Sequence, residues 1–231
     1  MRKSIIIPVF NQSHFTKQCL SDLFYLDSDN EIIIVNNGST DRTITIIEEI
    51  CKKPHTCSFK LINNDKNLGF AKACNIGYVN SSNDIIIFLN NDIRISKDSL
   101  SSWTNDIEKQ LKDNLLVSPT GGMLDNKFNF QYETNGMKPW VYLSGWLLCG
   151  YKDTFNKLAQ NLNQPGCFIE EFGTYFEDTY MSFQAKKLGI ELKIIKTPLQ
   201  HIGKGTSNRM NLQDIYLSAK QKFIKKVKEL S

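Results

Sequence analysis

The chain has 231 residues, of which 41% are hydrophobic and 23% are charged. This ordinary globular composition fits one large α/β domain or two fused halves. The net charge of +4 is too small to indicate a nucleic-acid partner, and no run of about 18 apolar residues is present to predict a membrane-spanning helix.

Up to Leu89, short apolar runs alternate with segments of helical periodicity. The predicted strands are Ser4–Val9, Glu31–Val35, Phe59–Ile62 and Ile85–Leu89, and the predicted helices between them are Ser13–Leu26, Asp41–Lys52 and Gly69–Tyr78. Ser13 is placed to cap the first helix, and Asp41 either caps the second helix or contacts a ligand. Continuous apolar strands separated by helices are typical of a mostly parallel α/β sheet that is covered on both faces.

Each of these four strands is followed by a polar turn that is rich in amides. Asn11 follows the first strand, Asn36–Asp41 the second, Asn63–Gly69 the third and Asn90–Asp92 the fourth. Ligands of such sheets bind outside the carboxyl ends of the strands. Four amide-rich turns at one edge therefore predict a pocket for a polar ligand.

The second half of the chain has a weaker pattern. The predicted elements are a helix over Ser99–Leu111, a strand over Leu115–Ser118, a helix from Glu177 to Gly189, a strand over Glu191–Ile195 and a basic amphipathic helix over Leu212–Ser231. Gly, Asn and Asp dominate residues 121–137, which are predicted to be an irregular loop. Glu177 and Asp178 fall in the first turn of their helix, where carboxylates complement the helix dipole, so a structural role is one interpretation of this pair.

The six cysteines form no C-x-x-C pair and show no zinc-like spacing. Buried, reduced thiols in a cytosolic protein are the expectation. The N-terminal stretch MRKSIIIPVFN begins with basic and apolar residues, but Pro8 and Asn11 interrupt it and no small-residue cleavage site follows. This stretch is therefore predicted to be the first strand of the fold rather than a signal peptide.

Five segments resemble, in this order, the family 2 glycosyltransferases of the GT-A fold: IIIPVFNQ, EIIIVNNGSTD, NLGFAKACNIG, IIIFLNNDI and YFEDTYMSFQAKKLG. The resemblance extends to about Ser207. It implies a single GT-A domain over residues 1–231 with a mostly parallel, Rossmann-like central sheet. Residues 1–115 would form the half that binds a nucleotide sugar, and residues 116–231 would form the acceptor-binding half with the basic C-terminal helix.

The resemblance implies that the turns after the strands hold the nucleotide diphosphate of a donor sugar. The residues carried over are Pro8, Phe10, Asn11, Asn37, Asn67, Gly69, Lys72, Asn75 and Asn91. Lys72 either reaches a phosphate or lies on a solvated helix face. Members of the family often have an acidic pair where this chain has Asn36 and Asn37. Because an amide both donates and accepts hydrogen bonds, recognition of the base is expected to differ.

Asn90, Asn91 and Asp92 occupy the positions of the family's metal-binding DxD element. Mg²⁺ and Mn²⁺ prefer oxygen ligands and readily bridge a diphosphate. Asp92 supplies the one carboxylate, and Asn90 would act through its amide oxygen or through water. His201, which precedes the basic stretch Gly203–Ser207, is the further candidate as a metal ligand or diphosphate contact. The alternative is an Asn-rich turn in which Asp92 caps the next helix.

The resemblance assigns catalysis to the Glu-Asp pair of the last segment. Asp178 is the implied general base, and Glu177 orients the base or the acceptor, although the two roles are open to exchange. One base and in-line attack imply an inverting transfer of a hexosyl or deoxyhexosyl group to a hydroxyl of a glycan or lipid-linked glycan. By the same resemblance Gly145 and Trp146 lie near the sugar, with a core position as the alternative for Trp146.

Two other functions compete with this one. A sugar nucleotidyltransferase would need a glycine-rich, basic loop after the first strand, where this chain has PVFNQSHFTK. A catalytically silent nucleotide-sugar-binding module stays open because of the asparagines at 36, 37 and 90. The helix Leu212–Ser231 either packs on its own domain or contacts an anionic membrane, so the expected location is cytoplasmic, with possible peripheral attachment at the inner face of the membrane.

Overall fold

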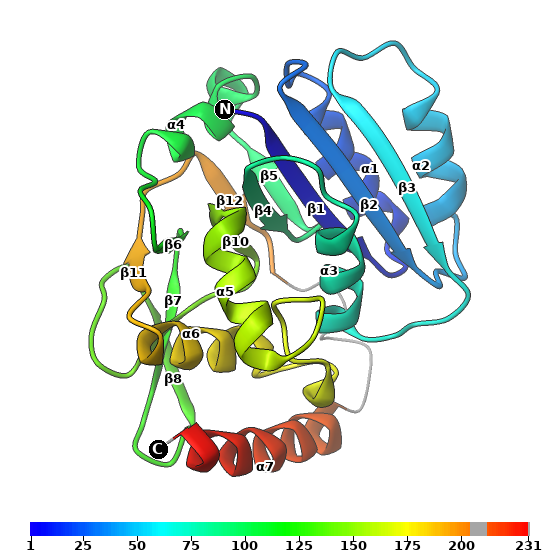
Figure 1. Ribbon diagram of the computed structural model, residues 1–231. Coiled ribbons are helices and arrows are strands. Elements are labelled where there is room, and N and C mark those ends of the chain that lie inside the picture. Colours follow the sequence, from blue (N-terminus) through cyan, green and yellow to red (C-terminus); the bar gives the residue numbers. More distant parts are fainter. Residues whose placement is uncertain (204–211, 231) are drawn as a thin grey trace.

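The computed structural model describes residues 1–203 and 212–230, and a seven-stranded sheet forms its centre (Figure 1). The strands of this sheet are β1 (Lys3–Val9), β2 (Asn30–Asn37), β3 (Ser58–Asn64), β4 (Ile85–Leu89), β6 (Leu115–Ser118), β10 (Leu147–Tyr151) and β11 (Glu191–Ile194). Their spatial order is β3-β2-β1-β4-β10-β6-β11. Each neighbouring pair is parallel except that β10 runs antiparallel to both β4 and β6. The prediction of a mostly parallel sheet is confirmed.

Helices cover both faces of this sheet, as predicted. On one face lie α1 (Ser13–Leu23), α2 (Thr43–Cys51) and α4 (Trp103–Glu108), and on the other lie α3 (Phe70–Val79), α5 (Lys152–Leu162) and α6 (Glu177–Lys187). Because successive strand residues point to opposite faces, Ile5 and Ile7 enter the first core and Ile6 enters the second. Both faces are buried, which explains why the predicted strands are apolar without alternation.

Helix boundaries differ from the predictions where a cap comes from another turn. The predicted cap by Ser13 is wrong: α1 begins at Ser13, and the Ser13 N–H donates to the Asp41 carboxylate at 3.1 Å. The same carboxylate accepts the Thr43 N–H at 2.9 Å at the start of α2, so Asp41 joins two helix N-termini. The predicted helix Ser99–Leu111 is also shorter, because the 3₁₀ turn η1 (Lys97–Ser99) precedes α4.

The prediction of an irregular loop over residues 121–137 is wrong. The strands β7 (Gly121–Leu124), β8 (Phe130–Thr134) and β9 (Val141–Leu143) form a small antiparallel sheet in the order β8-β7-β9. The glycines that suggested a loop are needed for close packing, since a Cβ atom on Gly122 would lie 2.3 Å from the Tyr142 ring. A further pair, β5 (Ile93–Ile95) with β12 (Leu199–His201), is antiparallel.

The C-terminal helix α7 (Leu212–Leu230) packs across α6 and the 3₁₀ turn η2 (Glu170–Phe172) (Figure 1). Ala219 and Phe223 are fully buried there. The helix thus uses its predicted apolar stripe on its own domain, and Ser231 at its predicted end lies outside the described residues. Within residues 1–203 and 212–230, no helix combines the length and the apolar character that spanning a bilayer requires.

Candidate active site

The carboxyl ends of β1 and β4 open into a cleft of about 500 Å³ that also reaches α6 and the first turn of α7. Five of the residues expected to bind the donor line this cleft: Pro8, Phe10, Asn37, Asn67 and Asn91. The expected metal ligands and both expected catalytic residues line it too: Asn90, Asp92, His201, Glu177 and Asp178. The structure therefore brings together most of the predicted site from turns that are far apart in the sequence.

Four predicted donor residues do not line the cleft among its described walls. Asn11 joins the first two turns, because its Oδ1 accepts the Thr40 N–H at 2.7 Å. Lys72 forms an ion pair with Glu170 at 3.3 Å. Asn75 is buried, and its amide bonds to both the N–H and the carbonyl of Phe168. These three side chains therefore bond to other parts of the protein, and their contact with a donor stays a prediction.

The fourth of these residues, Gly69, precedes α3 with a φ of +88°. A Cβ atom there would lie 2.9 Å from the carbonyl oxygen of Gly173, in the turn before α6. Glycine is required at 69 because the two turns approach so closely and because the backbone is left-handed. This contact connects the donor half of the chain to the segment that carries the carboxylate pair.

Asn37 ties the second and third turns together. Its Nδ2 donates to Asn67 Oδ1 at 2.8 Å and to the Gly69 carbonyl at 3.2 Å, while its Oδ1 accepts the Leu68 N–H at 3.0 Å and Asn64 Nδ2 at 3.1 Å. The two backbone partners fix the orientation of the amide. A carboxylate would present oxygen to two acceptors here, so the local partners require asparagine rather than the acidic residue common in the family.

Asp92 lies beside His201 because β12 pairs with β5. Asp92 Oδ1 is 3.1 Å from His201 Nε2, and the His201 ring stacks on Trp146 with an interplanar angle of 4°. Trp146 Nε1 donates to Thr120 Oγ1 at 2.9 Å. Trp146 is buried in the core, which confirms the core interpretation, and it also lines the cleft. Its position near the sugar stays a prediction. Lys204–Ser207, which follow this cluster in the sequence, lie outside the described residues.

The side chains around Asp92 fit a hard divalent cation that a diphosphate helps to hold. Among the described residues, no group of three or more His, Cys, Asp or Glu side chains forms a cage for a metal. Around Asp92 the cleft wall offers this one carboxylate, the His201 imidazole and the amide of Asn90, whose buried Oδ1 has no hydrogen-bond partner among the described residues. Mg²⁺ is often bound by one or two carboxylates together with substrate phosphates and water, so this set is sufficient only when a diphosphate is present.

The two carboxylates at the start of α6 have different surroundings. Asp178 Oδ2 accepts the Gly145 N–H at 2.9 Å, and its Oδ1 accepts the Thr179 N–H at 2.6 Å. Glu177 Oε2 is buried without a partner. Burial raises the pKa of both groups, and the Asp178 charge raises the pKa of Glu177 further, whereas hydrogen bonds from Gly145 and Thr179 oppose the rise at Asp178. The hydrogen bonds from Gly145 and Thr179 therefore favour the charged form of Asp178, and Glu177 Oε2 has no such partner.

The turn that presents this pair has a strained backbone. Tyr175 and Phe176, directly before Glu177, have φ values of +78° and +66°. Such angles are uncommon for bulky residues and cost on the order of 1–3 kcal/mol each. The Tyr175 side chain lines the cleft, and so do Thr174, Ser144 and Ile215, which the sequence analysis did not identify. Of these four residues, Tyr175 could have been predicted from the sequence, because it lies only two residues before Glu177.

Comparisons with known proteins agree with this geometry. Residues 4–172 match the family model described as Glycosyl transferase family 2. Glycosyltransferase GlyA of Streptococcus pneumoniae is 25% identical over 215 residues, which cover 80% of this chain and 30% of that protein. The chain spans less than half the length of this and other curated relatives that it matches.

Two solved structures show the same fold. Staphylococcus aureus TarS 1–349 in complex with UDP-GlcNAc superposes with a TM-score of 0.63 at 19% identity, covering 94% of this chain and 64% of that one. Mannosyltransferase PcManGT from Pyrobaculum calidifontis, in complex with GDP-Man and Mn²⁺, has a TM-score of 0.63 at 16% identity and covers 84% of this chain and 54% of that one. At these identities the likeness is evidence for the fold alone.

Proposed function

Since the chain belongs to glycosyl transferase family 2 and has a GT-A fold, we propose that it is an inverting glycosyltransferase that uses a nucleotide-diphosphate sugar. The acceptor in this proposal is a hydroxyl of a glycan or lipid-linked glycan, as part of bacterial surface-polysaccharide synthesis. The observation that carries the proposal is the cleft itself. It places the Asp178 carboxylate in one cavity with the amide-rich turns and with Asp92.

In the proposed reaction, the acceptor oxygen attacks the anomeric carbon of the donor sugar. The new bond between this oxygen and carbon forms as the bond from the carbon to the diphosphate oxygen breaks. The acceptor proton passes to Asp178, and the electron pair leaves with the diphosphate. A positioned base contributes roughly 10²–10⁴-fold to such a step. Asp178 suits this role because the Gly145 and Thr179 hydrogen bonds favour its charged form.

Glu177 suits the orienting role. Burial and the Asp178 charge raise the pKa of Glu177 and so favour its protonated form, whose O–H can donate a hydrogen bond to an acceptor. Asp92, Asn90 and His201 would hold a Mg²⁺ or Mn²⁺ ion together with the donor diphosphate. When bound, the cation supplies positive charge that stabilises the leaving group.

The location is part of the same proposal. The described chain contains six free cysteines, of which five are buried, and burial raises the thiol pKa of all six. Such thiols suit a reducing compartment such as the cytoplasm. Lys222 and Lys225 on α7 are exposed and would face an anionic membrane surface while the apolar side of the helix stays packed on α6. Sedimentation with vesicles that contain anionic lipid, at low and high salt, measures this contact.

The test of the donor site is a thermal-shift series with UDP, dTDP, GDP and CDP, each with and without Mn²⁺. A ligand that binds only the folded state raises the melting temperature by mass action. We expect one nucleotide to stabilise the protein, more strongly with Mn²⁺, and the Mn²⁺ effect to disappear in Asp92→Ala. If no nucleotide shifts the melting temperature, the proposed donor site is wrong.

Turnover separates an enzyme from a silent binding module. We expect the wild type to hydrolyse the matching nucleotide sugar slowly, and transfer to an acceptor to fall by at least about 10²-fold in Asp178→Asn. Nucleotide stabilisation should persist in this variant, because Asp178 is not a donor ligand. Stabilisation by a nucleotide without any turnover of its sugar would favour the binding module instead.

A further inference from the structure

A second, smaller cavity shares a wall with the donor cleft. Its volume is about 130 Å³, and it lies between the β7–β8 sheet, the start of α6 and the first turn of α7. Tyr175, Glu177 and Asp178 line both cavities. We propose that this cavity, which we call the aromatic cavity, binds the terminal sugar ring of the acceptor, and that this sugar carries no charged group. This inference rests on the proposed function.

The position of the carboxylates gives the aromatic cavity its role. A general base must reach the hydroxyl from which it takes a proton. Asp178 faces the donor cleft on one side and the aromatic cavity on the other. An acceptor ring in the aromatic cavity can therefore present a hydroxyl to Asp178 at the border with the donor cleft.

The lining of the cavity suits a sugar ring. Five of its walls are aromatic: Phe130, Tyr142, Tyr175, Phe176 and Tyr216. The C–H face of a sugar packs on aromatic rings, whose faces are electron-rich. Polar groups also line the cavity, because Thr179, Glu177 and Asp178 stand beside the Tyr142 ring. A mostly apolar cavity with a few convergent polar groups is typical of a small-molecule site.

The charge of the cavity selects against anionic acceptors. Two of the described residues in its lining are acidic, and none of the described ones is Lys or Arg. Glu177 is buried, with one oxygen that lacks a partner. A terminal phosphate or uronic acid would lose its hydration beside these carboxylates without gaining a counter-charge, which is unfavourable. A neutral sugar meets no such penalty.

The C-terminal helix supplies one wall of the cavity. The Tyr216 ring lies 5.7 Å from the Tyr175 ring and 5.2 Å from the Phe176 ring. Its hydroxyl lies close to the backbone of Phe130 on β8. The preceding residue, Ile215, lines the donor cleft. The first turn of α7 thus borders both cavities.

The test compares Phe130→Ala with Tyr132→Ala. Both side chains are about half exposed on β8, so neither truncation removes core packing, but only Phe130 lines the aromatic cavity. The probes are methyl β-D-glucoside and N-acetylglucosamine as neutral sugars, and glucuronate and glucose 6-phosphate as anionic ones. Saturation-transfer NMR measures their binding, and the thermal shift with nucleotides is recorded on the same samples.

We expect the neutral sugars to bind wild type and Tyr132→Ala equally and to bind Phe130→Ala roughly two- to tenfold more weakly, as the loss of one aromatic contact implies. Anionic sugars should give no signal. Equal binding to both variants, equal binding of anionic sugars, or no sugar binding at all would overturn the inference. If nucleotides stabilise the samples in that case, the donor site stands and only the acceptor inference fails. If nucleotides do not stabilise them, the proposed function itself fails.

Discussion

Glu177 is a buried carboxyl whose Oε2 has no hydrogen-bond partner among the described residues. Burial, and then the Asp178 charge, raise its pKa above the ordinary value of 4.5. The folded protein therefore holds this proton more tightly than the unfolded chain, and Glu177 destabilises the fold as the pH rises from 4.5 through its folded pKa.

The substitution Glu177→Gln removes this titration while it keeps a hydrogen-bond donor. We expect its melting temperature to match the wild type below pH 4.5 and to exceed it at higher pH, by a difference that grows until the folded pKa is passed. Thermal unfolding from pH 4 to pH 9 measures this. Glu133→Gln, on the exposed strand β8, is the control and should show no growing difference. A difference in melting temperature between Glu177→Gln and wild type that stays constant at every pH would contradict the raised pKa of Glu177.

Asn37 leads to a second prediction, about stability rather than catalysis. In Asn37→Asp, a carboxylate would face Asn67 Oδ1 and the Gly69 carbonyl, which now accept from the amide. We expect the free energy of unfolding to fall by about 1–3 kcal/mol, the cost of leaving such groups unpaired. Urea denaturation measures it.

Asn63→Asp is the matched control for this change. Asn63 Oδ1 accepts from Asn36 Nδ2, and a carboxylate keeps that acceptor. The control should lose little stability. If Asn37→Asp is no less stable than Asn63→Asp, the donor role of the Asn37 amide is wrong.

The sequence located the asparagines at one sheet edge but could not indicate which way each amide faces. Asn37 and Asn90 line the cleft, although the Asn37 amide also bonds to the next turn, whereas Asn11 and Asn75 do not line it and bond to other segments. The direction of such a side chain depends on backbone groups of distant segments, such as Phe168 for Asn75. Those partners are known only once the chain is folded.

At the scale of elements, buried parallel strands were predictable and the small exposed sheet was not. β1, β2 and β4 are continuous apolar runs because both of their faces are covered. β8 is exposed along most of its length, and its short alternation of Phe130, Gln131, Tyr132 and Glu133 follows a stretch rich in Gly, Asn and Asp that resembles a loop. The missed sheet matters for function, since β7 and β8 contribute Leu124 and Phe130 to the aromatic cavity.

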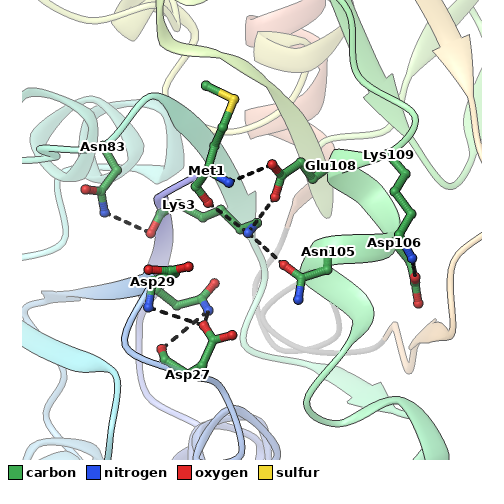
Figure 2. A network of polar contacts seen from close by, with 10 residues as sticks. Met1, Lys3, Asp27, Asp29, Asn83, Asn105, Asp106, Glu108 and Lys109 are labelled. Carbon is green, nitrogen blue, oxygen red and sulfur yellow. Dashed lines mark hydrogen bonds and ion pairs between the residues drawn. The ribbon is translucent and has the colours of Figure 1, made fainter.

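The start of β1 depends on a buried lysine. Lys3 is only 1% exposed, and its Nζ donates to the Met1 carbonyl at 2.9 Å and to Asn105 Oδ1 at 2.8 Å (Figure 2). It also lies 2.7 Å from Glu108 Oε2, so the lysine joins the strand to α4. Figure 2 shows these partners gathered around the ammonium group.

Removing Glu108 alone leaves the Lys3 charge buried without its ion-pair partner, and removing both Lys3 and Glu108 leaves no buried charge. We expect Glu108→Ala to lower the free energy of unfolding by about 2 kcal/mol, and the double variant Lys3→Met with Glu108→Ala to recover part of that loss. Urea denaturation of the two variants measures the coupling. Asp106→Asn breaks the exposed pair with Lys109 on the same helix and should change little. A double variant less stable than Glu108→Ala would contradict the argument.

At the scale of the whole molecule, the two sheet faces and the C-terminal helix form three separate cores. The third core joins α7 to α6 and η2, and Phe223 is its centre, with ring contacts to Phe128, Phe172, Phe176, Tyr180 and Phe183. Since this core shares few elements with the sheet, α7 can open without unfolding the donor half.

Phe223→Ala tests whether α7 opens in this way. Truncating a buried phenylalanine costs about 3–5 kcal/mol, which we expect to appear as local release of α7. Amide hydrogen exchange should then become faster in α7 while β1, β2 and β4 stay protected. Because Tyr216 leaves with the helix, binding of neutral sugars should weaken while stabilisation by a nucleotide persists. Leu217→Ala, at an exposed position on the same helix, should change neither. Equal loss of protection in α7 and in the central strands would instead show one cooperative unit, in which the acceptor wall cannot move independently of the donor site.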